Sequence, residues 1–197
     1  MIKHIQYILI LSLCLVNNAL ALIEIDITEG NREPLPIAIS DFFYDEIDSS
    51  KLSEISVNLS NVVKADLERC GLFEPINKDA FIQNNSAMHL RPRFADWRLI
   101  KSQALVTGKL KIVDGDKLRV EFRLWDTLAE KEIEALVLIT TLDNWRRISH
   151  MISDKVYERL TGERGYFDTR ILYVSESGPK NQRIKKLAIM DLSLIHI

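Results

Sequence analysis

The chain has 197 residues, of which 47% are hydrophobic and 27% are charged, and its formal net charge is −2. These values are ordinary for a soluble globular protein of one or two domains. The near-neutral charge argues against a nucleic-acid or membrane-surface partner. The densest basic cluster, Arg183 with Lys185 and Lys186, lies beside apolar residues and is interpreted as the solvated side of a strand or turn.

The first 21 residues differ in composition from the rest of the chain. A short region with Lys3 precedes the almost unbroken apolar run 5–16, and Ala19-Leu20-Ala21 follows. This pattern is typical of a secretory signal peptide cleaved after Ala21, with Ala19 and Ala21 forming the A-x-A site. The apolar run is too short for a permanent membrane anchor. The alternative is a buried N-terminal helix.

Two cysteines occur, and only one would remain after cleavage. Cys14 raises the possibility of a lipoprotein signal, but Leu13 occupies the preceding position, where a small residue is required. Cys70 alone makes no internal disulfide, so the exported protein must rely on core burial for stability. Cys70 lies on the apolar face at the end of a predicted helix, which favours a small buried side chain over a nucleophile.

The mature chain begins with a segment of strand pattern. Residues 22–28, LIEIDIT, alternate apolar and polar side chains, as in a half-buried or edge strand, and 29–34 break the pattern with turn formers. Residues 35–40 form a second, apolar strand. From Ser49 onward, apolar residues recur at three- and four-residue steps until Gly71, which predicts a capped amphipathic helix.

A run of strands follows this helix. The first, 72–76, is expected at a sheet edge because Pro75 has no amide hydrogen. Residues 77–92 are polar and irregular, and a short helix is predicted at 94–102. Alternation predicts three more strands, with one buried face and a hairpin turn at Asp114-Gly115-Asp116 between the first two. These strands are 104–113, 118–125 and 131–140.

A last helix is predicted from Asp143, as N-cap, to Leu160. The order of elements over 34–162 predicts an α/β layer domain with a mixed sheet and with helices packed on one face. Beyond Gly162, only two strands are predicted, 169–175 and 183–191. Two strands alone are marginal in water, so this hairpin is expected to belong to a second, mostly absent domain. The alternative places it in the sheet of the first domain.

Motifs for catalysis, metal binding and phosphate binding are absent from the sequence. His89 and His150 lack ligand-like spacing, and His150 is interpreted as a satisfied histidine at a helix interface. We therefore expect no catalytic residue, cofactor or metal. The alternatives are a periplasmic hydrolase associated with a propeller, or a solute-binding α/β module.

Several segments in order carry a family resemblance: PIAISDF, VVKADLERCGLFEP, FADWR, ALVTGKL, VEFRLWD, ISHMISDKVYERLTGERGYFDTRILYVS and LAIMD. Together with the signal peptide, they resemble the TolB family of the Tol-Pal cell-envelope system. The most specific block is 150–175, where the helix, L-T-G, G-x-F and R-I-x-Y-V match in turn.

The resemblance implies a fold and a function. TolB-like proteins join an N-terminal α/β domain to a six-bladed β-propeller, so 163–191 would be the first strands of an incomplete propeller. The implied role is a non-enzymatic periplasmic scaffold without cofactor or membrane insertion. It would connect inner-membrane TolA with outer-membrane Pal for envelope integrity and constriction at division, and bacteriocins would exploit it for import.

The resemblance also implies where partners bind. The TolA-binding segment of the family matches the mature N-terminus, 22–33, whereas the Pal surface lies mainly on the propeller and is mostly missing from this chain. From the residues alone, the alternating segment suits either strand addition to a partner or a strand of the protein's own sheet. The residues predicted to contact TolA are Leu22, Ile23, Glu24, Ile25, Asp26, Ile27 and Thr28.

The last six residues depart from the family pattern. Where the family continues with an acidic turn, this chain has LSLIHI at 192–197, an apolar suffix without turn signals. We interpret it as a non-native tail and exclude it from the fold prediction.

Overall fold

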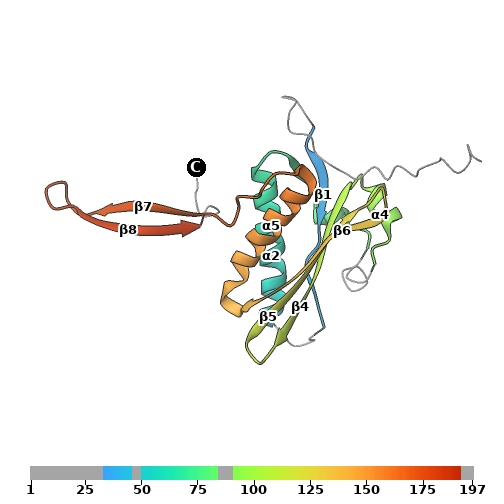
Figure 1. The fold of residues 1–197 in the computed structure, drawn as a ribbon, viewed down its shortest axis with the longest axis horizontal. Helices are drawn as coiled ribbons and strands as arrows, with labels where there is room; N and C mark the ends of the chain where they lie inside the picture. The colour runs from blue at the N-terminus through green and yellow to red at the C-terminus, as the bar shows by residue number, and fades with distance from the viewer. Residues whose placement is uncertain (1–32, 46–49, 84–90, 192–197) are drawn as a thin grey trace, which may run out of the picture.

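A computed structural model describes residues 33–45, 50–83 and 91–191 (Figure 1). The predictions for the signal peptide, the strand at 22–28 and the tail at 192–197 lie outside these residues. The described chain forms one mixed sheet with helices on both faces, followed by a separate hairpin that extends away from the sheet.

The sheet has the strand order β3-β1-β4-β5-β6, and a short strand β2 also pairs with β4. Strand β1 runs parallel to both β3 and β4, whereas β4, β5 and β6 are antiparallel neighbours. The predicted mixed sheet is therefore confirmed, and β3 lies at its edge as Pro75 predicts. The strands are β1 Leu35–Ile39, β2 Phe43–Tyr44, β3 Phe73–Pro75, β4 Ala104–Val113, β5 Lys117–Asp126 and β6 Lys131–Thr141.

The main core lies between one face of the sheet and two long helices, α2 (Ser50–Arg69) and α5 (Trp145–Thr161). These helices present the apolar stripes that the sequence predicts, and each buried Leu or Ile contributes about 1.5–3 kcal/mol relative to exposure. Figure 1 shows α2 and α5 side by side on this face. The stripe of α2 comprises Leu52, Ile55, Leu59, Val63 and Leu67, and that of α5 comprises Ile148, Ile152, Val156 and Leu160.

The opposite face of the sheet carries the third helix, α4 (Phe94–Leu99). Its Phe94 and Trp97 pack with Leu105 and Trp125, residues that alternate along β4 and β5 with those facing the main core. The expectation that all helices lie on one face is wrong, because at one end of the sheet both faces carry apolar side chains.

Strand β2 was not predicted from the sequence. It pairs with β4 through Phe43 and Lys109, and the preceding Phe42 is buried in the main core. The Phe42 ring occupies the space above Gly108, where an added Cβ would lie 2.0 Å from a ring carbon and 2.5 Å from the Glu121 carbonyl oxygen. A glycine is therefore required where Phe42, just before β2, packs against β4.

The start of α5 also differs from the prediction. Asp143 lies within a short 3-10 helix, η2 (Leu142–Asn144), and α5 begins at Trp145. The N-cap of α5 is Asn144, which makes no side-chain cap hydrogen bond, so Asp143 is not the cap. A second 3-10 helix, η1 (Lys78–Ala80), lies in the segment predicted to be irregular. The end of α5 is as expected, because Gly162 closes it with a φ of 74°.

The hairpin consists of β7 (Arg170–Ser177) and β8 (Ile184–Asp191), which pair with each other and with no other described strand. The alternative that placed it in the sheet of the first domain is therefore wrong. The segment before it still packs on the α/β body, since Phe167 is buried in the main core against Tyr157.

Candidate functional site

The residues predicted to bind a partner, Leu22 to Thr28, lie before Glu33, the first described residue, as do Ala19 and Ala21. Where the described chain begins, Leu35 donates its amide to the carbonyl oxygen of Leu72 at 2.9 Å. The described chain therefore begins beside the segment that follows the C-terminal end of α2.

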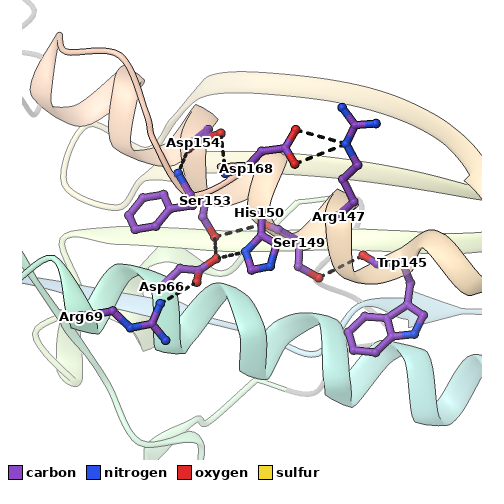
Figure 2. A network of polar contacts seen from close by, with 10 residues as sticks. Asp66, Arg69, Trp145, Arg147, Ser149, His150, Ser153, Asp154 and Asp168 are labelled. Atoms are coloured by element: carbon purple, nitrogen blue, oxygen red, sulfur yellow. Dashed lines mark hydrogen bonds and ion pairs between the residues drawn. The ribbon is translucent and has the colours of Figure 1, made fainter. Parts of the chain in front are cut away.

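A buried polar network centred on Asp66 joins α2 to α5 (Figure 2). The Asp66 carboxylate lies 2.6 Å from His150 Nδ1 and accepts a hydrogen bond from the Ser153 hydroxyl at 3.0 Å. Arg69 approaches its other oxygen at 3.4 Å. Asp66, His150 and Ser153 are each at most 2% exposed, so these three side chains are almost wholly buried.

The local sequence places these groups on facing helices. Asp66 lies beside Leu67 in the apolar stripe of α2, and His150 and Ser153 lie one turn apart on the buried side of α5. The prediction that His150 is a satisfied interface histidine is confirmed. Asp66 and Ser153 were missed, although an acidic residue within an apolar helical stripe is a signal for a buried partner.

A serine, a histidine and an aspartate suggest a nucleophilic triad, but their arrangement differs from one. In a triad the serine bonds to the histidine and the histidine to the acid. Here, Ser153 reaches Asp66 and the carbonyl oxygen of Ser149 instead of the imidazole. Two donors thus converge on one carboxylate, an arrangement that holds two helices together and activates no nucleophile.

Cys70, at the end of α2, is half-buried against the core, and its thiol donates to the Leu67 carbonyl oxygen at 3.0 Å. Burial raises the pKa of this thiol above its usual 9.0. The protonated form therefore predominates near neutral pH, which makes Cys70 a poor nucleophile.

The junction between α5 and the hairpin is fixed by Asp154. Its carboxylate accepts the backbone amides of Phe167 at 2.6 Å and Asp168 at 3.2 Å, and Arg147 pairs with Asp168 at 3.2 Å (Figure 2). Desolvation by burial raises the pKa of Asp154, against the opposing effect of the two amides. Gly165 lies so close that an added Cβ would be 2.4 Å from Asp154 Cα.

The hairpin beyond this junction exposes apolar side chains on both of its faces. One face carries Leu172 and Val174, with cross-strand partners Ile189 and Leu187, and the other carries Tyr173. Glu176 near the tip pairs with Arg183 and Lys185, and these hydrogen bonds lower its pKa. A two-stranded sheet is marginally stable in water, and exposed apolar side chains on both of its faces are typical of a surface that packs against other chain segments.

Metal centres and membrane spans are two further features that would bear on function. In the described ranges, no group of three or more histidine, cysteine, aspartate or glutamate side chains is arranged to hold a metal ion. Among the same residues, no helix is long and apolar enough to cross a membrane.

Comparison with known proteins identifies the family to which this chain is similar. Residues 23–133 match the model of the TolB amino-terminal domain. The chain belongs to the TolB family. It is 55% identical over 192 residues to the Tol-Pal system protein TolB of Pelagibacter ubique (strain HTCC1062), an alignment that covers 94% of this chain and 43% of that protein.

A solved TolB structure agrees with the fold. The crystal structure of TolB from Acinetobacter baumannii superposes with a TM-score of 0.64 at 25% identity, covering 86% of this chain and 39% of that one. The predicted fold class is confirmed: a mixed α/β domain followed by a hairpin that forms no closed barrel, consistent with the start of an incomplete propeller. The chain spans less than half the length of the TolB relatives that it matches.

Proposed function

We propose that this chain is the amino-terminal part of a non-enzymatic periplasmic scaffold of the Tol-Pal system, linking inner-membrane TolA to outer-membrane Pal. The observation that carries the proposal is the 55% identity to a Tol-Pal system protein over nearly the whole chain. In this role the protein would support envelope integrity and outer-membrane constriction at division, and would be used in bacteriocin import.

The geometry of the described residues favours a scaffold over a hydrolase. The polar side chains that would suit catalysis converge on Asp66 between two packed helices, where His150 and Ser153 are almost wholly buried. The conspicuous exposed feature is the apolar hairpin, whose side chains suit packing against protein.

The proposed TolA-binding residues are Leu22 to Thr28. Their apolar side chains, Ile23, Ile25 and Ile27, alternate with polar ones, so one face of an added strand would bury them against the partner. A stretch of the length from Thr28 to Leu35 can span roughly 20 Å when extended, a reach that suits strand addition to a partner's sheet edge.

The hairpin has a separate proposed role. We assign β7 and β8 to the opening strands of a propeller blade, with the Pal-binding surface formed mainly by further blades. In this assignment, neighbouring strands cover Leu172, Val174 and their cross-strand partners.

The test of the TolA assignment uses the processed chain beginning at Leu22. Binding to the isolated periplasmic domain of TolA is measured by isothermal titration calorimetry for wild type, for a deletion of 22–33 and for Ile25→Asp. Both changes are expected to abolish detectable binding, because an aspartate on the apolar face prevents its burial.

The matched control is Asp26→Asn, on the opposite face of the segment, which is expected to change the affinity by no more than about threefold. Circular dichroism should report an unchanged fold in all variants, since β1 begins only at Leu35. Wild-type affinity in the deletion variant would refute the assignment.

A further inference from the structure

A pocket of about 210 Å³ lies on the surface between α2 and the first turn of α5. It is distinct from the segment 22–28 and from the hairpin. Its α2 side combines polar, charged and small apolar residues, and its α5 side is aromatic and basic. The lining residues are Asn58, Asn61, Val62, Ala65, Asp66, Arg69, Trp145 and Arg146.

Arg146 is the unusual member of this lining. Its Nε is buried yet has no hydrogen-bond partner among the described residues, and its guanidinium lies 6.0 Å from the centre of the Trp145 ring. A buried donor without an acceptor costs about 1–3 kcal/mol. The next residue, Arg147, differs because it pairs with Asp168. The Arg146 side chain is therefore positioned for an acceptor that the described chain does not supply.

Two neighbouring features favour an anion in the pocket. Arg69 lines it from α2, and its contact to Asp66 is long, at 3.4 Å. In addition, the first turn of α5 carries no acidic residue and its N-cap makes no side-chain hydrogen bond. The positive end of the α5 dipole is therefore not neutralised by its own side chains.

We propose that this pocket binds a carboxylate side chain of an extended acidic peptide from a partner protein. Arginine and asparagine side chains supply donors for the two carboxylate oxygens. Val62, Ala65 and the Trp145 ring supply an apolar wall suited to the aliphatic stem of an acidic side chain. Asp66 lies in the same lining and reduces the net positive charge, which disfavours a doubly charged phosphate.

The test measures binding of a blocked hexapeptide of alternating Glu and Val to the full chain lacking its leader. The readout is the two-dimensional amide NMR spectrum, in which the Trp145 indole and the α2 and α5 amides beside the pocket are expected to shift on titration. The matched peptide with Gln in place of Glu is expected to bind at least about tenfold more weakly, a ratio that corresponds to about 1.4 kcal/mol.

The variant Arg146→Gln keeps a polar side chain but shortens it and removes its charge, and it is expected to weaken binding of the Glu peptide about tenfold or more. Arg164→Gln makes the same charge change at an exposed residue outside the pocket and should leave binding unchanged. Equal weakening by both variants would mean that only net charge is sensed, and would overturn the proposal.

A second variant keeps the proposal testable if Arg146→Gln unfolds. Asn58→Asp introduces a carboxylate into the lining, where it is expected to pair with Arg146, raise the melting temperature and reduce peptide binding. Peptide shifts confined to the hairpin or to the opposite face of the sheet would overturn the proposal. An equal response to inorganic phosphate, competing at the same Trp145 and Arg146 resonances, would overturn the choice of a carboxylate.

Discussion

At Asp66, a single carboxylate accepts contacts from two side chains of α5 and from Arg69 of its own helix. His150 is 84 residues away in the sequence. The contact is therefore a long-range one between the two helices that cover the sheet. Removing the carboxylate would take its charged partner from the buried His150 imidazole and leave the Ser153 hydroxyl with the Ser149 carbonyl oxygen as its acceptor.

We expect Asp66→Asn to lower the free energy of unfolding by about 2–5 kcal/mol, because buried donors then lack a charged acceptor. The measurement is urea unfolding followed by circular dichroism. Glu68→Gln, an exposed position on the same helix, is the control and should change stability by less than about 0.5 kcal/mol. Equal effects of the two variants would show that the network contributes no specific stability.

Asp154 predicts a pH dependence. Because burial raises the pKa of its carboxyl, the folded state holds the proton more tightly than the unfolded state does. The associated stability is fully present below the unfolded pKa, near 3.8, and is lost as the pH rises through the folded pKa. Relative to Asp154→Asn, the wild type should thus become progressively less stable as the pH is raised from about 4.

The measurement for Asp154 is the difference in unfolding free energy between wild type and Asp154→Asn at several pH values. Using the difference removes the contributions of the other carboxyl groups, which are common to both proteins. A difference that is flat, or that grows in favour of the wild type with rising pH, would contradict the prediction.

At the scale of elements, the packing of Phe42, just before β2, against β4 depends on the absence of a side chain at Gly108. Gly108→Ala is expected to destabilise the protein by about 2–3 kcal/mol, because the new Cβ meets the Phe42 ring and a backbone oxygen at the same time. Thermal unfolding of the purified variant measures this effect.

Gly115→Ala provides the comparison for Gly108. Gly115 has a φ of 82°, and an added Cβ there meets no atom within 4 Å. The expected cost is about 1 kcal/mol, from backbone conformation alone. A smaller loss at Gly108 than at Gly115 would mean that β2 shifts easily and adds little to the sheet.

The elements that the sequence predicts correctly are those with a repeating local pattern. The stripes of α2 and α5 and the alternation in β4, β5 and β6 follow from side-chain periodicity. Strand β2 has only two residues, and its place in the sheet depends on pairing with the distant β4, so no local pattern reveals it. The face of the sheet on which α4 packs likewise depends on apolar residues of β4 and β5 that are distant in sequence.

In the candidate sites, too, local patterns are visible in the sequence, whereas contacts between distant residues are not. His150 was identifiable as an interface residue because it lies within the α5 helix, but its partner Asp66 depends on how two helices pack. The unpaired Arg146 Nε is also a property of packing, since the sequence contains many other arginines. Leu22 to Thr28 were predicted from alternation and family resemblance, and their role stays a prediction.

For the whole molecule, the α/β body and the hairpin differ in the strand pairing and core packing that stabilise them. Within the sheet, β4 and β5 have paired neighbours and a core, whereas β7 and β8 pair with no described strand other than each other. Hydrogen exchange should therefore give opening free energies under about 2 kcal/mol for the hairpin amides, while β5 amides approach the global stability of about 5–15 kcal/mol.

This comparison is made within one sample by mass spectrometry, so β5 serves as the internal control for the hairpin. Protection of β7 equal to that of β5 would contradict the interpretation that the hairpin stands apart. In a longer TolB protein with neighbouring blades, the same hairpin amides are expected to become protected, because both apolar faces would then be covered.

The burial of Phe167 determines where a gene for the first domain can be cut. The helical signal stops at Gly162, but a recombinant protein ended there would lose the ring that packs on Tyr157. Loss of a buried phenylalanine leaves a cavity and typically costs about 3–5 kcal/mol. A protein ended after Asp168 would keep the ring, the two amides bound by Asp154 and the Arg147 pair.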